Sequence, residues 1–65
     1  MVVTRTLELI GGSPNSWGEA VENAIKEAAK TAKDIRRVYV KSLMCNVSDG
    51  KIVEYRAQVR MAVPV

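Results

Sequence analysis

The sequence contains no histidine and no phenylalanine, and its 65 residues include a single cysteine, Cys45. One cysteine cannot form a disulfide within the chain, and one thiol without histidine cannot supply the ligands of a zinc site. A catalytic nucleophile also needs a base that activates it, and Cys45 has no histidine to serve as one. No catalytic residue set or metal-ligand set is therefore expected, and the chain is not expected to be an enzyme.

Long apolar runs are missing as well. No run approaches the roughly 20 residues needed to cross a bilayer. Segment 1–6 is interrupted by Arg5 and is not followed by the small-residue cleavage site of a signal peptide. We therefore expect a cytoplasmic protein with a reduced thiol and no membrane partner. The net charge of +3 is modest, and the basic residues lack the interleaved aromatics that stack bases, so no nucleic-acid partner is expected.

The length of the chain limits how it can be stabilised. Residues 1–65 suffice for one domain, and a domain of this size buries only about 60% of its unfolded surface when it folds alone. Small domains commonly rely on disulfides, a structural metal or oligomerisation. Because the first two supports are not expected here, the sequence favours a homo-oligomer.

A helix is predicted to begin at residue 17. Ser16 and Glu19 have the spacing of a capping box, in which each side chain satisfies a free backbone donor at the helix start. From Trp17 to Ile35 the apolar residues recur every three or four positions and form one stripe. Acidic residues lie towards the start and basic residues towards the end, as the helix dipole favours. The pattern predicts an amphipathic helix of about five turns.

Three segments have the alternation of β-strands. Residues 3–10 form the first and end at Gly11-Gly12, and residues 37–45 form the second. Asp49-Gly50 then favours a type I′ hairpin turn. Residues 51–63 form the third strand, in which one face carries Tyr55, Ala57, Val59, Met61 and Val63. The sequence predicts an α+β fold of order β-α-β-β.

One helix can cover only one face of a three-stranded sheet. The other face is predicted to carry Arg37, Tyr39, Lys41, Leu43, Arg56, Gln58 and Arg60. This face must contact water, a ligand or another subunit. Aromatic and aliphatic side chains and long arginine stems exceed what a solvated face requires, which favours a subunit interface that encloses a ligand. The candidate ligand-binding residues are Arg37, Tyr39, Arg56 and Gln58.

Taken together and in order, several segments of the chain resemble the dodecin family. They are Gly11 or Gly12 with Ser13, Pro14, Ser16 and Trp17; then residues 19–25, 28–31 and 49–55. The resemblance spans nearly the whole chain. It implies a β-α-β-β protomer whose three-stranded antiparallel sheet wraps around one helix. It also implies a hollow homododecamer of cubic symmetry that holds paired flavin rings between subunits.

Two positions depart from the family pattern. Flavin-binding dodecins have a tryptophan that stacks on the flavin at the position of Arg37, and a glutamine that contacts the ring edge at the position of Arg56. Both residues are cationic here, which argues against ordinary flavin stacking. We therefore expect a non-enzymatic dodecin-like shell that stores a small ligand, either FMN, riboflavin or another anionic molecule. The alternative is a structural assembly without flavin, stabilised by an ion such as calcium.

Overall fold

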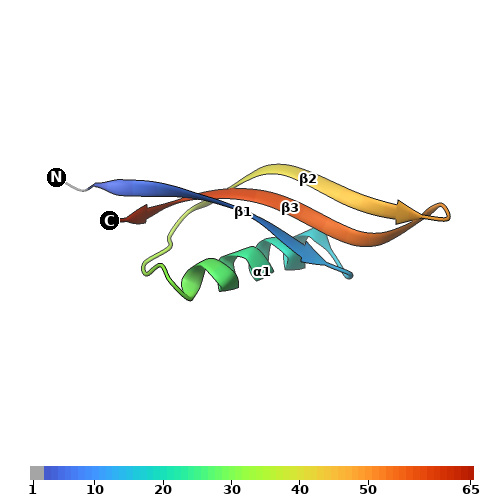
Figure 1. Ribbon diagram of the computed structural model, residues 1–65, viewed down its shortest axis with the longest axis horizontal. Coiled ribbons are helices and arrows are strands. Elements are labelled where there is room, and N and C mark those ends of the chain that lie inside the picture. The colour runs from blue at the N-terminus through green and yellow to red at the C-terminus, as the bar shows by residue number, and fades with distance from the viewer. Residues whose placement is uncertain (1–2) are drawn as a thin grey trace.

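The computed structural model describes residues 3–65; Met1 and Val2, which belong to the segment judged not to be a signal peptide, lie outside the described residues. The elements in chain order are β1 (Thr4–Ser13), α1 (Trp17–Ala29), β2 (Val38–Ser48) and β3 (Lys51–Pro64). The strands form one antiparallel sheet in the order β1-β3-β2, so β3 is central (Figure 1). The predicted β-α-β-β fold is confirmed. In the described part of the chain, no helix is long and apolar enough to span a membrane.

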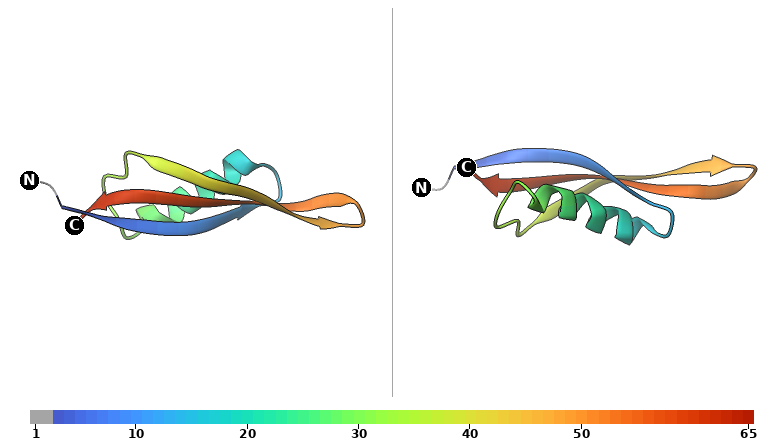
Figure 2. Two further views of the ribbon diagram at one scale, coloured as in Figure 1. Left: turned by 90° about the horizontal axis from the view of Figure 1, so that it is seen from above. Right: turned by 60° about the horizontal axis from the view of Figure 1, so that its bottom comes forward.

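The core lies between α1 and one face of the sheet (Figure 2). The helix contributes small side chains and β3 contributes larger ones; the buried residues are Ala20, Ala24, Ala28, Ala32, Ala57, Val59, Met61 and Val63. Alternate residues of β3 are buried from position 57 to position 63, which confirms the predicted face of this strand. A row of alanines on the helix lets it approach the sheet closely.

The start of α1 is held by the side chains of the preceding turn. Ser16 is the N-cap, and its hydroxyl accepts a hydrogen bond of 3.0 Å from the backbone N–H of Glu19. The Glu19 carboxylate accepts from the Ser13 hydroxyl (2.8 Å) and the Asn15 amide (3.0 Å), whereas the Ser16 N–H donates to Ser13. The predicted cap is therefore confirmed, but the reciprocal half of the capping box is replaced by a network centred on Ser13.

Trp17 fixes the first turn of α1 to the strands. Its indole Nε1–H donates a 2.8 Å hydrogen bond to the backbone carbonyl of Met44 in β2. Its ring meets that of Tyr55 edge-on, with the centroids 4.8 Å apart. The side chain remains partly exposed. Trp17 therefore packs the helix start against the β2–β3 pair, as its position in the stripe predicts.

The prediction that the first strand ends at Gly11-Gly12 is wrong. β1 continues to Ser13, and Gly11 pairs with Ala57 while Gly12 pairs with Arg56. A Cβ at Gly11 would lie 2.1 Å from the backbone oxygen of Ala20, so no side chain fits there. The absence of a side chain at Gly11 therefore allows strand and helix to lie close together, and Gly11 does not form a turn.

The predicted helix end at Ile35 is also wrong, because α1 ends at Ala29. The backbone N–H groups of Lys30 and Thr31 bond to carbonyls three residues earlier, which tightens the last turn. Asp34 then adopts a positive φ of 63° and redirects the chain towards β2. Ala32 and Ile35 still pack against the core, so their apolar spacing continues beyond the end of the helix.

β2 runs from Val38 to Ser48 and contains an irregularity between Val40 and Ser42. This β-bulge reverses the alternation of side chains. Leu43 consequently pairs with Ala57, whose side chain faces the helix. The prediction that Leu43 lies on the face opposite the helix is therefore wrong, because sequence alternation does not reveal the inserted residue.

The β2–β3 hairpin extends beyond the last residue of β1 and the start of α1 (Figure 1). Its turn is formed by Asp49 and Gly50, which both have positive φ angles (52° and 76°), as the predicted turn requires. β1 pairs with β3 only as far as Tyr55. Residues 46–54, which we call the hairpin arm, therefore have no third strand beside them in the part of the chain that the structure describes. Their apolar side chains Val47, Ile52 and Val53 are 61%, 45% and 52% exposed.

The molecule is long and thin, with extents of 52 × 19 × 13 Å. Its accessible surface is 4817 Å², compared with about 4100 Å² expected for a compact monomer of the same mass. The excess reflects a sheet with one bare face and a hairpin without cover. Both surfaces are available to other molecules.

Candidate functional site

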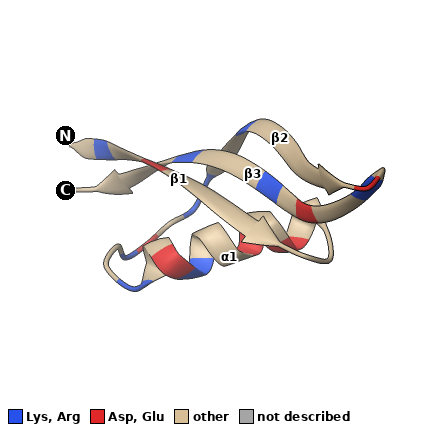
Figure 3. Cartoon of the chain, turned by 45° about the vertical axis from the view of Figure 1, so that its right-hand side comes forward, with Lys and Arg blue, Asp and Glu red and all other residues tan. Residues whose placement is uncertain are grey.

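The candidate site lies on the sheet face opposite α1, which we call the outer face. On β3 this face carries Arg56, Gln58, Arg60 and Ala62, which alternate with the buried residues. Pairing places residues of the edge strands beside them; these are Thr6, Glu8, Ile10 and Gly12 from β1, and Tyr39, Ser42 and Met44 from β2. Basic residues of β3 thus have acidic residues close by on β1 and on β3 itself (Figure 3).

Glu8 forms ion pairs with two cations in the middle of the outer face. Its Oε1 lies 2.7 Å from Lys41 Nζ and 3.6 Å from the Arg60 guanidinium. The hydrogen bond from Lys41 and the two positive charges hold the pKa of the Glu8 carboxyl below its usual range. These side chains are partly exposed, so each pair contributes little to stability alone. Together the three side chains carry a net charge of +1, and both cations lie beside a carboxylate.

Arg56 is also paired. Its Nε donates to Glu54 Oε1 over 2.9 Å, and the same oxygen accepts from the Asn46 amide at 2.8 Å. Two positions further along β3, Gln58 Oε1 accepts a 3.2 Å hydrogen bond from the Ser42 hydroxyl. The Gln58 amide NH₂ thus remains able to donate. Both predicted site residues are held in place by neighbours that alternation alone did not identify.

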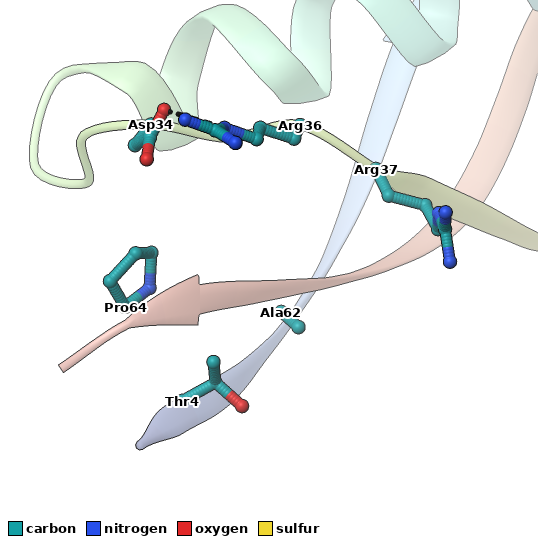
Figure 4. Close-up of a pocket in the computed structure, with 6 residues that line it drawn as sticks. All are labelled: Thr4, Asp34, Arg36, Arg37, Ala62 and Pro64. Carbon is teal, nitrogen blue, oxygen red and sulfur yellow. Dashed lines mark hydrogen bonds and ion pairs between the residues drawn. The ribbon is translucent and has the colours of Figure 1, made fainter. Parts of the chain in front are cut away.

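Arg37 lies at the opposite end of the outer face, where the chain enters β2. It lines a pocket of about 320 Å³ together with Thr4, Asp34, Arg36, Ala62 and Pro64 (Figure 4). Arg36 turns towards Asp34, and its Nε lies 3.0 Å from Asp34 Oδ1. Within residues 3–65, Arg37 has no ion pair.

The four predicted site residues share one face but do not converge within the subunit. Val38 pairs with Met61, so Arg37 lies beside Ala62, six residues from Arg56 along β3. At about 3.3 Å per residue this separates Arg37 from Arg56 by about 20 Å. Tyr39 pairs with Arg60 and lies between them, as does Gln58. A ligand that contacts all four would have to be extended or be shared between subunits.

Two carboxylates that form ion pairs on the outer face were not predicted from the sequence. Glu54 precedes Arg56 by two residues on the same strand, and this spacing alone could have indicated the pair. Glu8 could not be assigned to Arg60 or Lys41 without the register of β1 against β3. The sequence therefore predicted correctly which cations lie on the outer face, but it did not reveal the carboxylates that pair with them.

No group of three or more histidine, cysteine, aspartate or glutamate side chains in residues 3–65 is placed to hold a metal ion. The acidic residues Glu8, Asp34 and Glu54 instead bind basic side chains. A calcium site with several carboxylate oxygens would thus need ligands from more than one subunit.

A single helix packed on a three-stranded antiparallel sheet, with the opposite face open, defines a small α+β protein that presents a binding surface. The sequence model of the Dodecin family matches residues 3–65. This chain belongs to the Dodecin family. A search of curated proteins gave no match.

Solved structures agree with this assignment. Calcium dodecin from Mycobacterium tuberculosis, described as a calcium chelating immunodominant antigen with a novel calcium-binding site, is 31% identical. Its TM-score is 0.88, and the match covers 97% of this chain and 90% of that chain. Dodecin from Streptomyces coelicolor is 22% identical, with a TM-score of 0.93 and coverage of 98% and 91%. The tt0972 protein from Thermus thermophilus is 22% identical, with a TM-score of 0.93 and coverage of 100% and 96%.

Proposed function

We propose that this chain is the subunit of a non-enzymatic homododecameric shell that binds and stores a small ligand between its subunits. The ligand is a flavin or another anionic molecule. The observation that carries the proposal is the outer face, where no element of residues 3–65 covers Arg37, Tyr39, Arg56 and Gln58. Membership of the Dodecin family supports a small-ligand-binding role, and the number of subunits rests on the family resemblance.

Two features of the surface support assembly. The hairpin arm exposes apolar side chains at a distance from the core, and apolar surface of this kind is characteristic of sites that bind another protein. The thin shape also leaves a large surface for a chain of this mass. Neighbouring subunits that cover the hairpin arm would supply the burial that a 65-residue chain lacks.

The outer face offers suitable groups to FMN or riboflavin. Arg56 is held by Glu54, and its planar guanidinium can stack on an aromatic ring. The Gln58 amide can donate to the ring edge, and Tyr39 is exposed beside Arg60. In an assembly these groups would be supplied by more than one subunit.

Native mass spectrometry of protein purified without added ligand tests the assembly. We expect a mass of twelve subunits, with increments that match any retained ligand. A monomer or a dimer would reject the shell. Titration of riboflavin and FMN, followed by flavin fluorescence, tests the ligand; quenching is expected, and a lack of quenching by both compounds would reject flavin.

A second candidate is a structural assembly without flavin that is stabilised by an ion such as calcium. The 31% identical M. tuberculosis protein, described as calcium chelating, favours this alternative. Its ligands would come from several subunits, because carboxylates of one chain do not cluster in residues 3–65. An increase in melting temperature on addition of Ca²⁺ that EDTA reverses would support the alternative, and an unchanged melting temperature would remove it.

The proposal includes a cytoplasmic location and no membrane or nucleic-acid partner. Cys45 is a free and exposed thiol, which suits a reducing compartment. Labelling of this thiol in intact cells by a membrane-permeant maleimide, but not by an impermeant one, is the expected result for that location.

A further inference from the structure

The cations of the outer face differ in whether a carboxylate contacts them. Lys41 and Arg60 share Glu8, and Arg56 binds Glu54. An anionic ligand group placed beside any of these three would also meet a carboxylate. In the described residues, Arg37 is the outer-face cation without such a partner. An anion bound at Arg37 would therefore not have to compete with a carboxylate for that guanidinium.

The surroundings of Arg37 suit a compact anion. The pocket has a volume of about 320 Å³, at the lower end of the range typical of small-molecule sites. It contains two guanidinium groups and one carboxylate, so its net charge is +1. The carboxylate of Asp34 is hydrogen-bonded to Arg36 (Figure 4). Thr4, whose side chain carries a hydroxyl that can donate, is also one of the residues that line the pocket.

We propose that Arg37 binds the phosphate group of a phosphorylated ligand, with Thr4 as a second donor. The inference rests on the proposed ligand-binding function and narrows it to phosphate-bearing compounds. A guanidinium offers parallel N–H donors to phosphate oxygens, and such charge-assisted bonds are among the strong ones. Arg56 is less suited to this role, because a phosphate bound there would be repelled by the Glu54 carboxylate beside it. The outer face thus has an anion-binding end at Arg37 and a neutralised end at Arg56.

FMN and riboflavin form a matched pair of probes, because they share the ring and differ by one phosphate. We expect the wild-type protein to bind FMN at least about tenfold more tightly than riboflavin, as one charge-assisted hydrogen bond provides. In Arg37→Gln this ratio should fall to about one. Lys33→Gln is the control: it removes an exposed charge from the same connecting segment, outside the pocket, and should keep the wild-type ratio.

A calorimetric titration with inorganic pyrophosphate separates the phosphate site from flavin binding. Binding to the wild type and Lys33→Gln but not to Arg37→Gln would support the site even where neither flavin binds, in which case the flavin part of the proposed function fails. Equal affinities of the wild type for FMN and riboflavin would overturn the phosphate site and leave flavin binding intact. Absence of both pyrophosphate binding and an FMN preference would likewise overturn it.

Discussion

The part of the sheet that α1 covers and the hairpin arm are built from the same β3 strand, yet they are buried to very different degrees. Under the helix, Val59 and Met61 are fully buried. In the hairpin arm, Val47 and Ile52 pair with each other but remain about half exposed. Strand pairing alone therefore does not bury apolar surface. The covered region is buried by its own chain, whereas the apolar side chains of the hairpin arm remain exposed in the described residues.

The largest effect is expected where helix and strand touch through their backbones. Gly11→Ala would place a Cβ 2.1 Å from the Ala20 carbonyl oxygen, which a rigid helix cannot avoid without moving away. We expect the free energy of unfolding to fall by about 3 kcal/mol, measured by chemical denaturation. Gly18→Ala is the control, because its Cβ would have its nearest neighbour, Ser16 Oγ, at 4.0 Å, and it should keep or raise stability. Equal destabilisation by both variants would contradict the close approach.

Met61→Ala and Ile52→Ala compare the two regions directly. Met61 is fully buried within the chain, so its truncation should cost about 3 kcal/mol at any protein concentration. Ile52 is 45% exposed, and its truncation should act mainly on assembly, by lowering the melting temperature most at low protein concentration. An Ile52→Ala protein that melts like the wild type at every concentration would show that the hairpin arm is not covered by a neighbour.

Tyr55→Ala and Arg56→Ala test the two faces of β3 at adjacent positions. Tyr55 contacts the Trp17 ring on the helix side, so its loss should cost about 2 kcal/mol. Arg56 is partly exposed on the outer face, and its replacement should change stability by no more than about 0.5 kcal/mol. The two melting temperatures measure this difference; similar values would contradict the assignment of the faces.

The smallest effect concerns pH and the outer face. The pKa of Glu8 is lowered by the Lys41 hydrogen bond and by the charges of Lys41 and Arg60. A carboxyl with a lowered pKa in the folded state stabilises that state above its unfolded value, 4.5, and this contribution is lost as the pH falls through the folded pKa. Glu8→Gln should therefore melt slightly below the wild type at pH 7, and the gap should close in acid. A gap that does not change with pH would argue against the ion pairs.

Local signals allowed most of the fold to be predicted. The N-cap at Ser16, the alternation of β3 and the Asp49-Gly50 turn each depend on a few adjacent residues, and the structure confirms them. The errors arose where distant parts of the chain decide the outcome. Gly11 continues its strand because it pairs with Ala57 of β3, and Ala32 contacts the core beyond the helix end.

The sequence allowed the face of the candidate site to be predicted, but not the ion pairs that its cations form. The alternation of side chains along β3 correctly placed Arg56 and Gln58 on the face opposite the helix. The same rule, applied to β2, placed Leu43 on that face, which the β-bulge contradicts. That Glu8 forms ion pairs with Arg60 and Lys41 depends on pairing between segments more than thirty residues apart. Sequence patterns define such a surface only after the register of the strands is known.

The central position of β3 has a consequence for the order in which the chain folds. β2 and β3 are joined by two residues, so this hairpin can close quickly and early. β1 pairs with β3 in a register that joins Thr4 to Pro64, and this contact requires closure of almost the entire chain. β1 can therefore pack on α1 early, but its backbone groups must wait for β3 before they find strand partners.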